Sequence, residues 1–192
     1  LGLELTQNWA TYNTDVAGAL IPGKKLELDY TLANTGNKSM DVKEQIVITS
    51  PVAMSGAQAE FELYAANDVE QDSTTGAWKP KAEAQPVATR SLSRDGLKVT
   101  YEIPEFILNG TGENAETEDS VTATSKTGDY VIVFRDTAAN AFQGQTISID
   151  YLAQAKQHRN TGSDTWTTVA TDTITFAGND SFQAVPEAKL NS

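Results

Sequence analysis

The sequence predicts an all-β protein, an antiparallel jelly-roll-like sandwich with long loop insertions and one or two short helices. Segments of alternating or continuous apolar residues recur along the chain, and turn-forming residues separate them. The chain also contains 24 threonines, many of them clustered with Val, Ile and Tyr, which suit a pleated surface. Since no convincing amphipathic helix lies between these segments, a parallel α/β sheet is a poor fit.

Five segments alternate with a period of two residues, which makes one face of each predicted strand apolar. They are LGLELT (1–6), KLELDYTLAN (25–34), GLKVTYEI (96–103), QTISIDYLAQA (145–155) and VATDTITFAG (169–178). Two further segments, VKEQIVITS (42–50) and DYVIVF (129–134), contain continuous apolar runs typical of strands covered on both faces. Together they predict about seven or eight strands.

Residues 65–91 and 109–128 interrupt this pattern. The first stretch is polar and rich in alanine, and the second holds an acidic run from Glu113 to Asp119 without a large apolar residue. We expect both to be inserted loops, the first with a helical turn and the acidic one as an exposed, mobile excursion. Residues 135–145 are expected to form a short helix and residues 179–192 a flexible tail.

The chain of 192 residues fits a single domain, 1–192, that is long enough to bury a core without disulfides. Its net charge of −12 disfavours nucleic acid and anionic membranes as partners. No apolar run reaches the ~20 residues of a membrane helix, so we expect no membrane insertion. The opening LGLELT lacks an initiator Met and is interpreted as the cut end of a processed product.

Side-chain chemistry is sparse. The absence of cysteine excludes disulfides, Cys-based zinc sites and thiol catalysis, and the single histidine, His158, excludes two-histidine zinc sites within one chain. No G-x-S-x-G elbow or phosphate-binding loop is present, and the acidic run lacks the spacing of a calcium loop. We therefore expect no enzyme activity, no catalytic residue, no metal and no cofactor.

The three tryptophans support an alternative function. Trp9, Trp78 and Trp166 could stack on sugar rings, which would make the protein a cell-surface adhesin or a carbohydrate-binding β-sandwich. Scattered tryptophans also cap sandwich cores, and the sequence leaves both interpretations open.

The first predicted strand suggests an assembly interface. Leu1, Leu3 and Leu5 lie on one face of this strand at the end of the chain. A strand in that position can pair within its own sheet or extend the sheet of a neighbour.

The two ends of the chain contain a recognisable order of strands and turns. An alternating first strand leads to the turn Pro22-Gly23-Lys24-Lys25-Leu26, and the next strand ends in Asn34-Thr35-Gly36. A strand from Gly144 then runs into Gln157 near the end. This order resembles the TasA/camelysin (CalY) family of secreted Gram-positive proteins. Pro22, Gly23, Asn34 and Gly36 form the turn signature of this resemblance. Similar turns occur in other bacterial surface sandwiches, so a generic cell-surface or pilin-like domain is the competing interpretation.

The resemblance implies a secreted jelly-roll subunit of biofilm matrix fibres in which donor-strand exchange joins the subunits. The expected partners are further copies of the chain and a minor or anchoring subunit, in the extracellular matrix or at the cell surface. Camelysins are also classed as metalloproteases, which a chain with one histidine supports poorly.

Overall fold

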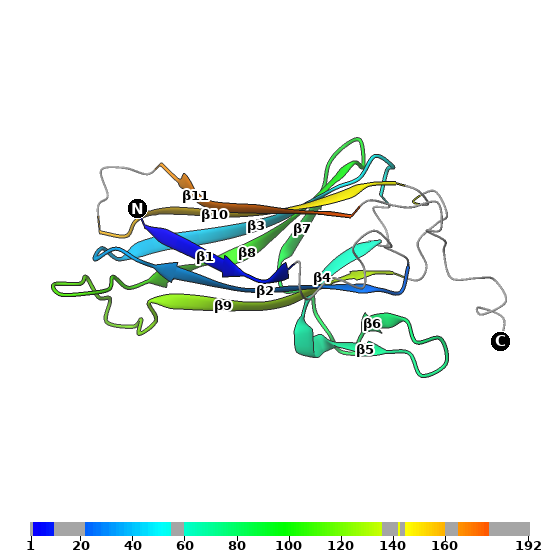
Figure 1. Cartoon of the computed structure of the whole chain (residues 1–192), viewed down its shortest axis with the longest axis horizontal. Helices are drawn as coiled ribbons and strands as arrows, with labels where there is room; N and C mark the ends of the chain where they lie inside the picture. Colours follow the sequence, from blue (N-terminus) through cyan, green and yellow to red (C-terminus); the bar gives the residue numbers. More distant parts are fainter. Residues whose placement is uncertain are drawn as a thin grey trace.

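The computed structural model describes residues 2–9, 22–54, 60–135, 142, 145–159 and 165–176. In this part of the chain, eleven strands form antiparallel sheets, and the two larger sheets stack face to face (Figure 1). The predicted all-β, jelly-roll-like sandwich is therefore confirmed. Within the described ranges, no helix has the length and apolarity that crossing a membrane would require.

The first large sheet, sheet A, has four strands. In spatial order they are β1 (Leu3–Gln7), β2 (Lys25–Asn34), β9 (Ser125–Phe134) and β4 (Phe61–Ala65). The second, sheet B, has five strands, in the order β11 (Thr167–Phe176), β10 (Ile147–Gln157), β3 (Met40–Thr49), β8 (Lys98–Leu108) and β7 (Thr89–Leu92). The chain crosses between the sheets after β2, β3, β8 and β9, and once more between β4 and β7, so strands distant in sequence become neighbours.

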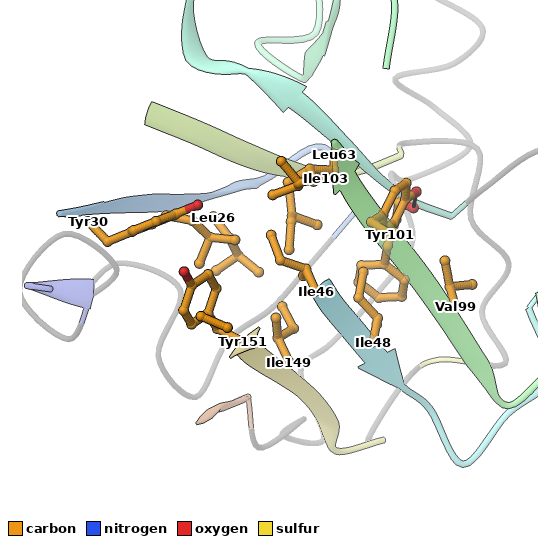
Figure 2. Packing of buried hydrophobic residues seen from close by; sticks show 14 of the residues in the cluster. Leu26, Tyr30, Ile46, Ile48, Leu63, Val99, Tyr101, Ile103, Ile149 and Tyr151 are labelled. Carbon is orange, nitrogen blue, oxygen red and sulfur yellow. Dashed lines mark hydrogen bonds between the residues drawn. The ribbon is translucent and has the colours of Figure 1, made fainter. Parts of the chain in front are cut away.

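The core lies between sheets A and B. Along β2 and β3, buried and half-buried residues alternate without interruption, as the period of two requires. Figure 2 shows Leu26 and Leu63 of sheet A packed toward Ile46, Ile103 and Tyr101 of sheet B. Burial of each such large aliphatic side chain contributes about 1.5–3 kcal/mol relative to exposure.

A smaller cluster covers the outer face of sheet A. Val131 and Val133 of β9 pack there with Tyr64 and Val69. The cover is a hairpin of β5 (Val69–Gln71) and β6 (Trp78–Pro80), which follows the 3₁₀ helix η1 (Ala66–Asp68). The predicted continuous apolar run at 129–134 is thus explained by a strand that is covered on both faces.

The structure corrects three expectations. The stretch 65–91 contains the expected helical turn, η1, but it is no plain loop, since it also contains β5, β6 and β7, and the strand β4 was also missed. Strands of three to five residues carry too few alternations for their period to be recognised. The second predicted loop ends earlier, because β9 already begins at Ser125. The expected helix 135–145, apart from residues 135, 142 and 145, and the tail 179–192 lie outside the described residues.

Gly128 of β9 provides a test of the packing between β2 and β9. A Cβ atom added at Gly128 would lie 2.3 Å from ring carbons of Tyr30. We expect Gly128→Ala to lower the free energy of unfolding by roughly 1–3 kcal/mol, because the Tyr30 ring must move. Urea unfolding measures this loss. The control Thr127→Ala changes an exposed neighbour and should alter stability by less than about 0.5 kcal/mol; equal stabilities of both variants would contradict the packing.

Candidate functional site

The predicted assembly residues lie partly within the sandwich. Leu3 and Leu5 are half-buried against the core, and β1 pairs along its length with β2. The Gln7 amide Nε2 also donates a hydrogen bond of 2.5 Å to Asp172 Oδ2 of β11, which links the two sheets. Leu1 lies outside the described residues. In this subunit β1 therefore serves its own sheet, which leaves its exchange between subunits as a prediction.

The residues of the turn signature occupy the two ends of β2 and do not come together. Gly23 adopts a positive φ of 88° and donates its N–H to the Phe134 carbonyl at 2.7 Å. Asn34 donates its side-chain amide to the Lys38 and Asn109 carbonyls, and it accepts the Gly36 N–H at 2.9 Å. These four positions act as turn residues in this structure.

An unpaired sheet edge lies along the first half of β9. β4 pairs with Tyr130–Phe134 only, and no strand of the described chain pairs with the free side of residues 125–129. Figure 1 shows β9 extending past β4 along the margin of the sandwich. The mismatch between a ten-residue strand and its five-residue neighbour creates this edge.

The direction of the main-chain groups at this edge follows from the ladder. Thr124 and Phe134 hydrogen-bond toward β2, whereas the Arg135 N–H bonds to the Glu60 carbonyl on the β4 side. Since the bonding direction alternates along a strand, Ser125 and Thr127 point their N–H and C=O groups toward the open side. They can form a ladder with an added strand.

Sheet B has a corresponding open stretch, but a bulge and a proline make it less suited to pairing. β7 pairs with Val99–Glu102 only, and the register with β3 shifts at the bulge near Pro104. The Lys98 carbonyl accepts a hydrogen bond on the β7 side, so the main-chain groups of the even-numbered residues of β8 point to that side. The first of them beyond the end of β7 is Pro104, which has no N–H to donate. A hollow of about 420 Å³ lies here, lined by Lys43, Glu44, Gln45, Thr89, Glu102, Ile103, Pro104 and Glu105. A bulge and a proline are common protections of sheet edges.

Half-buried aromatic residues lie on the inward side of the open margin. The Lys126 ammonium lies 4.7 Å from the Phe106 ring centroid and 5.3 Å from that of Tyr130. Phe106 belongs to β8 and Tyr130 to β9, and both are half-buried. The rings of Phe106 and Tyr130 thus line the inward side of the open edge, and the Lys126 ammonium contacts both of them.

Lys126 also contacts Glu44, which is completely buried in β3. The Glu44 carboxylate accepts hydrogen bonds of 2.5 Å from the hydroxyls of Tyr30 and Tyr151. Burial, and then the Glu44 charge, raise the pKa of both tyrosines far above the ordinary value, so both hydroxyls stay protonated as donors. With three donors, the buried carboxylate is paired and hydrogen-bonded, which points to a structural role.

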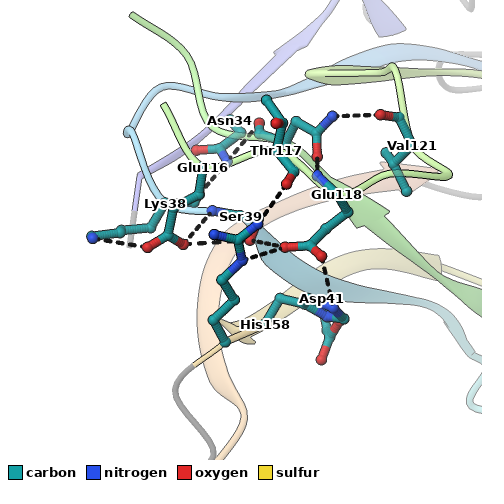
Figure 3. Close-up of polar contacts among 11 residues, drawn as sticks. Asn34, Lys38, Ser39, Asp41, Glu116, Thr117, Glu118, Val121 and His158 are labelled. Carbon is teal, nitrogen blue, oxygen red and sulfur yellow. Dashed lines mark hydrogen bonds and ion pairs between the residues drawn. The ribbon is translucent and has the colours of Figure 1, made fainter. Parts of the chain in front are cut away.

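The acidic stretch is held against the sandwich, which corrects the expectation of a free excursion (Figure 3). Glu116 accepts a hydrogen bond of 2.8 Å from Lys38, and Glu118 accepts bonds from Ser39 at 3.0 Å and Arg159 at 2.8 Å. Main-chain bonds add to this, including Glu116 N–H to the Asn37 carbonyl. The loop stays in place because its carboxylates accept hydrogen bonds from residues beside the ends of β3 and β10. Local composition does not show these distant partners.

The single histidine lies in the same polar cluster. His158 Nδ1 is 2.6 Å from Asp41 Oδ1, and its Nε2 is 3.7 Å from Glu118 Oε2. Among the described residues, no group of three or more His, Cys, Asp or Glu side chains is arranged to hold a metal ion. The contacts of His158 join the end of β10 to β3 and to the acidic loop.

The three tryptophans do not gather on one face. Trp9 is buried against Tyr30 and Tyr151. Trp78 packs on the outer face of sheet A, where Lys25 Nζ lies 3.8 Å from its ring centroid. Trp166 lies beside Lys43 and Lys156 of sheet B. A shared sugar-stacking surface of the kind that the sequence suggested is not formed.

No protein-family model matches the chain, and a search of curated proteins finds no match. Among solved structures, AvmM, which catalyses macrocyclization in alchivemycin A biosynthesis, is 11% identical, with a TM-score of 0.49 and coverage of 96% of this chain and 92% of its own. PapD-like domain 7 of human CEP192 is 10% identical, with a TM-score of 0.34 and coverage of 93% and 86%. A collagen-binding domain from a Staphylococcus aureus adhesin is 8% identical, with a TM-score of 0.23 and coverage of 92% and 97%. Likenesses this distant say nothing about what the chain does.

Two features of the site were missed at the level of sequence. One is Glu44, whose burial could have been inferred because it lies in phase with the inward residues Val42 and Ile46. The other is the open edge of β9, which left no signal in the sequence because it depends on where β4 ends.

Removal of Lys126 should test the buried network. We expect Lys126→Met to lower the free energy of unfolding by about 3–5 kcal/mol, because the Glu44 charge then lacks its cation. The added change Glu44→Gln should restore part of the loss. Urea unfolding at pH 7 measures both variants, and Lys79→Met, from the more exposed pair with Asp72, serves as control with an expected loss of about 0–1 kcal/mol. A loss for Lys126→Met no larger than that of this control would contradict the proposed role.

The acidic loop should weaken at low pH. The hydrogen bond from Lys38 holds the pKa of Glu116 below its ordinary value. Desolvation raises the pKa of Glu118, but the bonds from Arg159 and Ser39 outweigh it and the net pKa is lowered. A carboxylate whose pKa is lower in the folded chain than in the unfolded chain stabilises the fold at pH values above its pKa in the unfolded chain. This stabilisation is lost as the pH falls through its pKa in the folded chain.

We therefore expect the double variant Glu116→Gln, Glu118→Gln to be less stable than the parent at neutral pH, with the difference shrinking between about pH 5 and pH 3. Thermal unfolding across this range measures it. Glu113→Gln removes an exposed carboxylate of the same loop as a control. A difference that stays constant with pH would contradict the assignment.

Proposed function

We propose that the protein is a secreted structural subunit that assembles into extracellular fibres by β-strand addition, with the edge of β9 at residues 125–129 as the acceptor. The observation that carries this proposal is the unpaired edge of β9, where Ser125 and Thr127 direct main-chain groups away from β2. The resemblance to the TasA/camelysin family favours the same class of function.

The added strand would continue sheet A beyond the end of β4. Each new main-chain hydrogen bond contributes a net ~0.5–1.5 kcal/mol, because the edge groups exchange water for a protein partner. Inward side chains of the strand would cover the half-buried Phe106 and Tyr130, at about 25 cal/mol per Å² of apolar surface buried. Backbone pairing thus supplies attachment and the inward side chains supply register.

Sheet B is the weaker acceptor. Pro104 has no N–H to donate, and the bulge beside it disturbs the spacing that a regular ladder needs. The stretch Ser125–Asp129 contains no proline, and its pairing with β2 is continuous. Of the open stretches on the interior strands β8 and β9, the one on β9 therefore suits strand addition.

Uncontrolled association is opposed by charge. The chain carries a net charge of −12, so copies repel one another at low ionic strength. Lys126 and Asp129 place charges on the open stretch itself, a common way to keep an edge strand from pairing with unsuitable partners. A specific strand must compensate for these charges to bind.

Thr127→Pro provides the test of this acceptor. The Thr127 N–H faces the open side and takes no part in pairing with β2, so proline should leave the fold intact while removing a donor from the edge. We expect the fraction of the protein in fibres to fall by about tenfold or more, since a lost bond and a disturbed ladder cost about 1.4 kcal/mol or more. Sedimentation and negative-stain electron microscopy measure it.

Thr127→Ala, which keeps the main-chain N–H, is the matched control and should assemble like the parent. Circular dichroism of both variants checks that the sandwich is folded. Fibres of normal amount and length from Thr127→Pro would show that this edge is not the acceptor.

A further inference from the structure

Two carboxylates lie beside the open edge on the outer face of sheet A. Asp29 of β2 and Asp129 of β9 are direct register partners on this face, and their carboxyl groups interact with each other. Like charges directly opposite each other in a sheet are unfavourable. Asp129 is also the last residue of the open stretch, so this pair borders the surface that an added strand would cover.

The neighbours of this pair add more negative than positive charge. On β2, Glu27 lies on the same face, and Lys25 is engaged with Glu27 at 3.3 Å. On β9, the outward neighbours of Asp129 are Thr127 and Val131, which are uncharged. The 3₁₀ helix η1 and the strand β6, which both contact β9, contribute Asp68 and Lys79, and Lys79 is paired with Asp72 at 3.2 Å. β1 contributes the uncharged Thr6 beside β2.

Burial, followed by the hydrogen bond and the charge of Asp129, raises the pKa of Asp29 to about 6. Above that pH the Asp29 carboxylate is charged. Below it the carboxylate takes up a proton, and the outer face loses one negative charge. The outer face beside the edge is therefore most negative at neutral and alkaline pH.

We infer that the open edge of β9 selects an extended partner segment with Lys or Arg at the outward position opposite Thr127, and rejects a segment with Asp or Glu there. This inference rests on the proposed function. A residue opposite Thr127 lies one diagonal step from Asp129, a separation that long basic side chains can span. A basic residue there would offset the charge of the Asp29–Asp129 pair, and an acidic one would increase the repulsion.

The inward positions of the same segment set a second requirement. They would lie over Phe106 and Tyr130, with Lys126 between the two rings, so apolar side chains fit there. The edge therefore takes a strand that alternates apolar inward residues with polar outward residues and has one basic residue at the central outward position. An acidic strand such as Leu3–Gln7, with Glu4 outward, does not meet this requirement at neutral pH.

Synthetic labelled peptides test the selection. Three seven-residue strands share alternating Val and Thr and differ only in a central outward Lys, Gln or Glu. Fluorescence anisotropy with the full chain at pH 7.5 and low salt should show the Lys peptide binding roughly fivefold to tenfold more tightly than the Glu peptide. The ratio should fall at pH 5, where the pair has taken up one proton, and it should approach one at pH 7.5 in the double variant Asp29→Asn, Asp129→Asn.

A matched control separates local selection from general attraction to an acidic protein. The double variant Glu70→Gln, Glu83→Gln removes two exposed carboxylates outside the open edge and changes the net charge equally. It should keep the peptide preference of the parent. Thr127→Pro, which keeps every charge, should lose binding of all three peptides.

The outcomes separate the two proposals. Equal binding of the three peptides to the parent, with loss in Thr127→Pro, would overturn the inference and leave the acceptor edge standing. A Lys preference that survives in the Asp29→Asn, Asp129→Asn variant would overturn the assignment to these residues. Failure of every peptide to bind the parent, or binding unaffected by Thr127→Pro, would overturn the acceptor edge together with the inference.

Discussion

Main-chain hydrogen bonding is the constraint on which the rest of this structure depends. Nearly every strand of the two large sheets finds a partner from a distant part of the chain, because unpaired N–H and C=O groups are costly once water is excluded. The first half of β9 is different. There β4 has already turned away into η1, so the outer side of Ser125–Asp129 has no neighbour in the described chain. The proposed function and its selectivity both arise from this unequal strand length.

The buried carboxylate Glu44 ties that edge to the core. Its Oε2 atom accepts hydrogen bonds from Tyr30 of sheet A and Tyr151 of sheet B, and its Oε1 atom contacts Lys126, which lies beside the open margin. Such a network demands one arrangement of the sheets, since any shift would leave a buried charge without a partner. The polar cluster around Glu116, Glu118 and Arg159 holds the loop before β9 in the same way at one end of the sandwich.

The strands that could be predicted are the long ones. β2 and β10 have ten and eleven residues, and their apolar positions alternate through the whole length, so local sequence was enough. β4 and β7 escaped prediction because four or five residues contain too little pattern, and β8 runs past a proline that is tolerated where β7 has ended. The acidic loop looked mobile because its partners, Lys38, Ser39 and Arg159, lie about 40 to 80 residues away in the chain.

By itself, the sequence determined the β class, the face that each long strand buries and the turns that end them, because side-chain period and backbone preference are local properties. It also showed that the chain contains one histidine and no cysteine, since residue types are visible without a structure. Only the tertiary structure decided which strand edges stay open, where Asp29 meets Asp129, and why Glu44 can be buried. Those features depend on pairing between distant segments, and a local sequence pattern does not show which distant segments will pair.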